Sequence, residues 1–140
     1  MWNRLRAELD EKGYGVYAVE LKSSGSLIGL LGFHWADFKA DFTPCVEIGW
    51  RLVPEAWGHG YATEGARACL EHGFARLGLD RVYSFTVCVN LPSQAVMQRA
   101  GMRKTAEFNH PKVAPDSVLY PHVLYVREAP THDSMTGFPV

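Results

Sequence analysis

The sequence predicts an α/β (α+β) domain in which a mixed, mostly antiparallel sheet is flanked by helices. Segments with apolar residues at every second position, as in strands, alternate with segments of helical spacing. Glycine or proline separates most of these segments. The chain has 140 residues, of which 47% are hydrophobic and 21% charged, and this suits one globular domain.

A helix and three strands are expected first. Apolar residues recur at helical spacing from Trp2 to Leu9 and Gly13 follows as a stop, so the helix is expected over 2–12. The strands expected next lie at 15–21, 26–33 and 46–52. The third strand alternates strictly, which places Glu47 on the face opposite the apolar residues.

The period changes after Pro54. Residues 62–77 show the stripe of an amphipathic helix with Gly78 as its C-cap. The β-rich run at 82–89 is typical of a strand covered on both faces. The elements expected last are a helix from 91 to 100, strands at 103–108 and 123–126, and a mobile tail at 130–140.

Composition excludes several classes of function. A formal charge of -1 argues against a nucleic-acid partner, and no run approaches the ~20 apolar residues of a membrane span. The three cysteines are scattered and form no CxxC, as expected for buried thiols in a reducing compartment, and cytoplasm is therefore expected. The histidines lack metal-ligand spacing, and no metal is expected.

The turn between the third strand and the next helix is the most informative segment. Gly58 and Gly60 let the backbone approach an anion, and the first amides of a helix have no internal partners, so the turn can seat a phosphate. The alternative, in which the glycines only shape the turn, stays open. A Walker loop does not fit because Tyr61 and Ala62 replace its Lys-Ser/Thr, and Thr63 disagrees with a dinucleotide fingerprint.

These residues resemble the GNAT N-acetyltransferase superfamily. Its members carry Gln/Arg-x-x-Gly-x-Gly/Ala at such a turn; Gly60 and Ala62 match, whereas Trp57 replaces Gln/Arg. The segment 57–64 (WGHGYATE) is similar throughout to the RimJ/RimL-like branch. Three other segments agree with that branch, namely Glu47-Ile48-Gly49, Asn90-x-x-Ser93 with Gly101-Met102, and His122-Val123-Leu124-Tyr125. The likeness runs from about Trp2 to Arg127 and implies an acetyltransferase domain at 1–129.

The resemblance implies transfer of an acetyl group from acetyl-CoA to a primary amine, in a protein N-terminus, an amino acid or a small amine. The acetyl-CoA is a cosubstrate, and its pyrophosphate is expected on the amides of the glycine turn. Transfer of another acyl group, or a noncatalytic coenzyme-A-binding module, stays open. The residues implied in coenzyme binding are Leu52, Val53, Trp57, Gly58, His59, Gly60, Tyr61, Ala62, Thr63, Asn90 and Ser93.

Two side chains are expected in the chemistry. Glu47 matches a glutamate that serves as base in the family, often through water; a solvated or Arg51-paired acid is the alternative. Ser93 resembles a serine near the coenzyme sulfur that can hydrogen-bond the leaving thiolate, with helix N-capping as the alternative. The amides around Leu52 and Val53 are expected oxyanion donors if the strand end bulges as in the family.

Two further expectations concern regions next to the site. His110 and His122 flank the last loop, where acceptor contacts are expected, and their roles stay open. The family fold starts with a strand and a helix before the helix expected at 2–12, and this chain is expected to lack both. The strand at 15–21 would then be an open sheet edge. A shortened chain or a homodimer that covers this edge would account for the difference.

Overall fold

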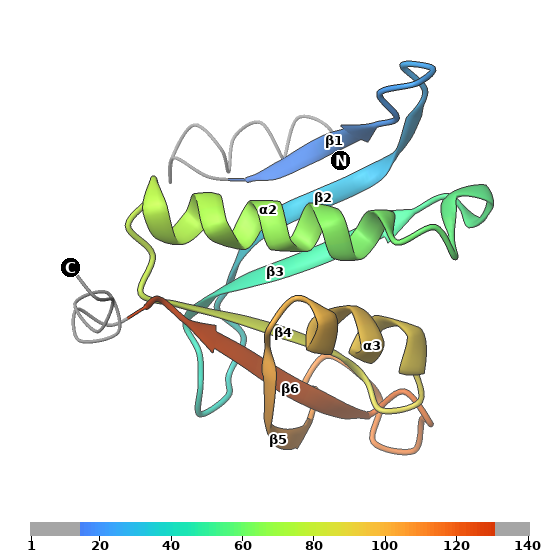
Figure 1. Ribbon diagram of the computed structural model, residues 1–140. Coiled ribbons are helices and arrows are strands. Elements are labelled where there is room, and N and C mark those ends of the chain that lie inside the picture. Colours follow the sequence, from blue (N-terminus) through green and yellow to red (C-terminus); the bar gives the residue numbers. More distant parts are fainter. Residues whose placement is uncertain (1–14, 131–140) are drawn as a thin grey trace.

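The computed structural model describes residues 15–130, and it confirms the predicted mixed α/β class (Figure 1). The helix predicted at 2–12 and nearly all of the tail predicted at 130–140 lie outside these residues. The elements in chain order are β1 Val16–Glu20, β2 Leu27–Ala36, β3 Cys45–Leu52, the 3₁₀ turn η1 Pro54–Ala56, α2 Tyr61–Ala75, β4 Arg81–Val87, α3 Leu91–Arg99, β5 Arg103–Asn109 and β6 Pro121–Glu128.

The sheet is mostly antiparallel, with the strand order β1-β2-β3-β4-β6-β5. Among the strands of residues 15–130, only β3 and β4 run parallel, and they meet in a single register pair, Glu47 with Tyr83. Beyond this pair the two strands separate toward their C-terminal ends (Figure 1). We call the space between them the split.

Local chemistry sets the ends of the elements close to where the sequence predicts them. α2 ends at Ala75 with Arg76 as its C-cap, and the predicted glycine Gly78 follows two residues later with a φ of 69°. The N–H of Leu79 donates to the Gly73 carbonyl at 3.0 Å, so Gly78 turns the chain back over the end of the helix. β2 continues to Ala36, three residues beyond the prediction, because its pairing with β3 extends that far. β4 ends at Val87, where a turn begins.

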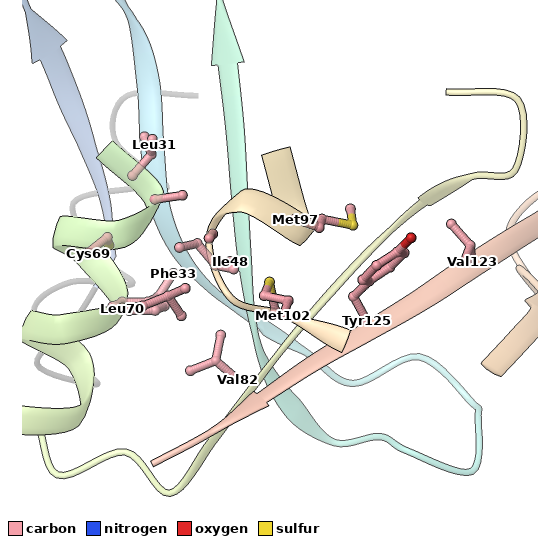
Figure 2. Packing of buried hydrophobic residues seen from close by; sticks show 12 residues of the cluster. Leu31, Phe33, Ile48, Cys69, Leu70, Val82, Met97, Met102, Val123 and Tyr125 are labelled. Carbon is pink, nitrogen blue, oxygen red and sulfur yellow. The ribbon is translucent and has the colours of Figure 1, made fainter. Parts of the chain in front are cut away.

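Both helices lie on the same face of the sheet and enclose the main hydrophobic core (Figures 1 and 2). Most of the core residues shown come from the helices and from β2, β3, β4 and β6, and Met102 lies between α3 and β5. α2 lies close to β2, since a Cβ added at Gly73 would be 2.7 Å from Phe33 Cζ. The largest fully buried side chains are Phe33, Ile48, Leu70, Met97, Val82 and Val123.

The opposite face carries a cluster of aromatic and histidine rings, which we call the aromatic cluster. Its members are Phe38, Phe42, Tyr83, Phe85, Phe108, His110 and His122. Phe38 and Phe42 belong to the β2–β3 loop, and their ring centroids lie 5.5 Å from those of Phe85 and Tyr83 on β4. The loop is thereby held against the sheet.

The cysteines are free thiols, two of them buried. Burial raises the pKa of Cys69 to about 12 and, together with the nearby Glu47 carboxylate, that of Cys45 to about 12. Both stay protonated and unreactive near neutral pH.

No helix within 15–130 is long and apolar enough to cross a membrane.

Candidate functional site

The candidate site lies where β3 and β4 end. Because these strands are parallel, their C-terminal ends meet the same edge of the sheet, and each strand is followed by a helix. The glycine turn follows β3, and the entrance of α3 follows β4. Ligands of α/β proteins commonly bind at such a position, where strand ends diverge.

The glycine turn presents a row of unpaired amides. Gly58 and Gly60 each have a φ of 78°, whereas no non-glycine residue within 15–130 has a positive φ, so the backbone alternates in hand through His59. Such alternation turns successive N–H groups toward one concave surface that attracts anions. Within the described chain the N–H groups from Gly58 to Thr63 donate to no acceptor, and the first that does is Glu64, to the Gly60 carbonyl at 3.0 Å.

The surroundings of this turn are open. A Cβ added at Gly58 or Gly60 would meet no atom within 4 Å, so these glycines are required by their backbone angles and not by lack of space. The rings of His59 and Tyr61 stack at 5.2 Å beside the turn. The unpaired amides can therefore reach a ligand from solvent.

Two hydrogen bonds fasten the turn to the end of β3. The indole N–H of Trp57 donates to the Leu52 carbonyl at 2.8 Å, and the N–H of Val53 donates to the Ile28 carbonyl at 2.8 Å. The Trp57 side chain is nevertheless 65% exposed, so the indole lies at the surface and stabilises the turn through its hydrogen bond and not through burial in the core. Of the two amides expected as oxyanion donors, that of Val53 is engaged in the sheet, and no register shift interrupts β3.

The edge of β3 along the split carries further backbone groups that β4 does not pair. Ser84 Oγ donates to the Ile48 carbonyl at 2.8 Å, so the backbone groups of Ile48 point toward β4. Trp50 and Leu52 share this direction because backbone groups alternate along a strand. Neither has a register partner on β4. Ser84 was not predicted as a site residue, and its one signal in the sequence is a serine inside an otherwise β-rich run.

At the entrance of α3, Asn90 is the capping residue. Its Oδ1 accepts the N–H of Ser93 at 3.2 Å, and its Nδ2 donates to Thr86 Oγ1 at 3.1 Å. The Ser93 hydroxyl makes no hydrogen bond within 15–130. Capping, the alternative role of Ser93, thus belongs to Asn90, and the hydroxyl is available to a ligand.

Glu47 lies at the narrow end of the split, half-buried, in register with Tyr83 on β4 and His34 on β2. Gly49 follows on the same face, and a Cβ added there would meet no atom within 4 Å. Open space therefore adjoins the carboxylate. Arg51 pairs with no acid among the described residues, so the predicted alternative of a Glu47–Arg51 ion pair is not observed.

The structure does not bring the two predicted catalytic side chains together. Four residues of β4 follow Tyr83, which at a rise of about 3.3 Å per residue makes the split about 13 Å long. Ser93 lies beyond its wide end, in the first turn of α3. Glu47 and Ser93 therefore flank the split from opposite ends.

His110 and His122 lie beside the wide end of the split. His122 is in register with Val87 at the end of β4, and its ring centroid is 5.0 Å from that of His110. The His110 Nδ1 accepts the N–H of Lys112 at 3.2 Å. Burial, followed by the nearby His122 and Lys112, lowers the pKa of His110 below its ordinary value, so this ring is neutral at pH 7.

A groove between α2 and α3 begins at the glycine turn, and no pattern in the sequence predicted it. Arg67 Nε donates to the Arg99 carbonyl at 2.7 Å and joins the two helices at this point. The groove is lined by Gly60, Thr63, Glu64, Arg67, Ala68, Glu71 and Arg99.

No group of three or more potential metal ligands occurs in residues 15–130.

The chain is similar in sequence and in fold to known acetyltransferases. A family model described as an acetyltransferase (GNAT) domain matches residues 1–103. The FsC-acetyl coenzyme A-N(2)-transacetylase of Aspergillus fumigatus is 41% identical over 71 residues, which are 51% of this chain and 29% of that protein. The uncharacterized N-acetyltransferase YnaD of Bacillus subtilis is 36% identical over 92 residues, 66% of this chain and 52% of that protein.

The fold agrees with solved structures as well. A GNAT-family acetyltransferase from Bordetella pertussis superposes with a TM-score of 0.75 at 28% identity, covering 90% of this chain and 74% of that one. The chain spans 29% and 52% of the lengths of the two relatives compared by sequence.

The lowered pKa of His110 predicts a pH dependence of stability. Below about pH 6.5 the unfolded chain takes up a proton that the folded chain resists, so stability falls as the pH drops from 6.5 toward the folded pKa. We expect His110→Gln to flatten the melting temperature between pH 6.5 and 5. His72→Gln, on the exposed surface of α2, is the control and should keep the wild-type slope. Equal slopes for His110→Gln and wild type would contradict the prediction.

Proposed function

The chain belongs to the GNAT acetyltransferase family, and we propose that it transfers an acetyl group from acetyl-CoA to the nitrogen of a primary amine. The observation that carries this proposal is the row of unpaired amides from Gly58 to Thr63. Backbone N–H groups at a helix entrance are suited to a diphosphate because they combine hydrogen-bond donors with the positive end of the helix dipole.

The split supplies a place for the rest of the coenzyme. In the proposal, the pantetheine arm leaves the diphosphate and runs along β3, where the backbone groups of Trp50 and Leu52 have no register partner on β4. An amide-containing arm in this position can satisfy those of Trp50 and the N–H of Leu52 as a neighbouring strand would, whereas the Leu52 carbonyl already accepts the Trp57 indole N–H. The thioester then lies inside the split between Glu47 and Ser93.

The chemistry follows from this placement. The amine nitrogen bonds to the thioester carbonyl carbon, the carbon–sulfur bond breaks, and the amine proton is lost. We assign Glu47 as the base. About 16 Å separate Leu52 from Glu47 along the strand, so Glu47 acts through water, and the amide of Trp50, which lies between them, serves as the oxyanion donor. The Ser93 hydroxyl hydrogen-bonds the departing thiolate.

The acceptor is assigned only as a class. The N(2)-transacetylase name of the Aspergillus relative supports acetylation of nitrogen, and the match at 57–64 supports the RimJ/RimL-like branch. A protein N-terminus, an amino acid and a small amine all fit. Open space at Gly49 lets an acceptor reach Glu47 from the face that carries the aromatic cluster. Cytoplasmic location and a second copy at the β1 edge stay predictions.

The glycine turn gives the first test of this function. Gly60→Ala forces an alanine toward a φ of 78°, which costs about 1–2 kcal/mol or is relieved by turning the amides away from the ligand. We expect at least a tenfold loss of acetyl-CoA affinity by calorimetry. Gly78→Ala is a matched control, since Gly78 has a φ of 69° and equally open surroundings at the other end of α2.

Gly78→Ala should lower stability to a similar extent and leave the affinity unchanged. NAD, which also carries a diphosphate, should bind to neither variant nor to wild type. Absence of heat with acetyl-CoA in the wild-type chain would refute the proposed function. Equal affinities of the two variants would refute the role of the turn.

Replacement of Glu47 by glutamine should slow turnover by about 10²-fold, because a positioned base contributes 10²–10⁴-fold. The affinity for acetyl-CoA should not change. Release of free thiol at saturating amine, taken from a panel of amines and peptides, measures the rate. Glu20→Gln, an exposed acid of β1, serves as the control. Turnover of Glu47→Gln at the wild-type rate would remove Glu47 from the mechanism.

Ser93 and Asn90 can be separated because only Asn90 caps α3. Ser93→Ala should lower the rate of thiol release and leave the melting temperature unchanged, since its hydroxyl makes no hydrogen bond within 15–130. Asn90→Ala should lower stability by about 1 kcal/mol through loss of the cap. A Ser93→Ala variant that loses stability but not rate would reverse the assignment.

A further inference from the structure

Tyr125 carries a buried hydroxyl that the proposed reaction does not use. The residue is 2% exposed, and its ring belongs to the main hydrophobic core (Figure 2). A buried hydroxyl requires hydrogen-bond partners, and Tyr125 finds them on α3. Gln98 Nε2 donates to the hydroxyl oxygen at 3.1 Å, and the hydroxyl donates to Gln94 Oε1 at 3.4 Å.

Gln94 connects this hydroxyl to the turn that joins β4 to α3. Its Nε2 donates to the Cys88 carbonyl at 2.9 Å, and the N–H of Cys88 donates to the Pro121 carbonyl at 3.0 Å. The side-chain hydrogen bonds thus run in one direction, from Gln98 through Tyr125 and Gln94 to the Cys88 carbonyl, and we call them the Tyr125 network. Hydrogen bonds in such a series polarise and strengthen one another.

The Tyr125 network reaches the residue next to Ser93. Ser93 precedes Gln94, and it lies one helical turn before Met97, which is 1% exposed in the core, so the Ser93 side chain is directed toward the sheet. Asn90 holds the backbone N–H of Ser93, but no hydrogen bond within 15–130 holds its hydroxyl. The position of the hydroxyl therefore depends on where the first turn of α3 lies relative to the end of β4, and the Gln94–Cys88 hydrogen bond joins these two segments.

We infer that Gln94, supported by the Tyr125 hydroxyl, is a positioning residue that keeps the Ser93 hydroxyl within reach of the thioester sulfur. This inference rests on the proposed function, because it takes Ser93 to hydrogen-bond the departing thiolate. A displacement of about 1 Å at a reacting group can lower a rate by about 10²-fold. Loss of the Gln94–Cys88 hydrogen bond should therefore lower the rate in the presence of Ser93 and leave coenzyme binding, which depends on backbone amides elsewhere, unchanged.

Thiol release at saturating acetyl-CoA and amine, together with calorimetry of acetyl-CoA binding, tests the inference on the full chain. Gln94→Met keeps the length of the side chain and removes its hydrogen bonds, so turnover should fall about tenfold at unchanged acetyl-CoA affinity. Tyr125→Phe keeps the ring in the core and removes the hydroxyl, and it should lower turnover about threefold. Gln98→Met is the matched control, because Gln98 contacts the same hydroxyl but not the β4–α3 turn, and its turnover should match wild type.

A second set of variants separates positioning from a structural role. In a Ser93→Ala background, Gln94→Met should cause no further loss of turnover, because the hydroxyl that it positions is gone. Should Gln94→Met fail to fold, Tyr125→Phe with and without Ser93→Ala makes the same comparison.

The outcomes also distinguish this inference from the proposed function. A full further loss in the Ser93→Ala background, an equal loss of acetyl-CoA affinity, or wild-type turnover of Gln94→Met would each overturn the inference and leave the proposed function in place. Absence of thiol release by wild type with every amine would overturn both.

Discussion

The parallel pair β3–β4 meets at one residue pair only, and the site depends on this divergence. A fully paired β4 would occupy the backbone groups of Trp50 and Leu52 and leave no room between the strands. Ser84 lowers the free-energy cost of the divergence, because its hydroxyl donates a hydrogen bond to the Ile48 carbonyl at the point where the strands stop pairing. On the far side, Phe38 and Phe42 pack against β4 and β5 and hold the separated half of the sheet in place.

Most of the proposed coenzyme contacts are made by backbone and not by side chains. The glycine turn needs a positive φ at Gly58 and Gly60, and the split needs only that β3 lose its neighbour. Side chains are proposed to take part only in the chemistry, namely Glu47 and Ser93 at the two ends of the split. The same division explains how one fold serves different acceptors, because the loops near the aromatic cluster can change while the backbone seat stays.

The sequence could predict elements and turns but not what strand pairing creates. Alternation and glycine positions placed β3, α2 and the Gly78 turn nearly where they lie, because these features are local. The split has no local signal: the run that forms β4 is typical of an ordinary covered strand. The Arg67–Arg99 contact joins residues 32 positions apart, and the rings of Phe38 and Phe42 come from a loop, so neither follows from periodicity.

Trp57 shows how a departure from the general motif is accommodated. The family pattern has Gln or Arg at this position, and a tryptophan cannot replace their several donors. Its indole has a single N–H, and this donates to the Leu52 carbonyl at 2.8 Å, a group at the end of β3. The side chain thus closes the segment from Leu52 to Trp57 while the ring stays 65% exposed. The turn is thus fixed to the strand. The N–H groups of the next six residues, 58–63, remain unpaired because no acceptor in the described chain lies within hydrogen-bond distance of them.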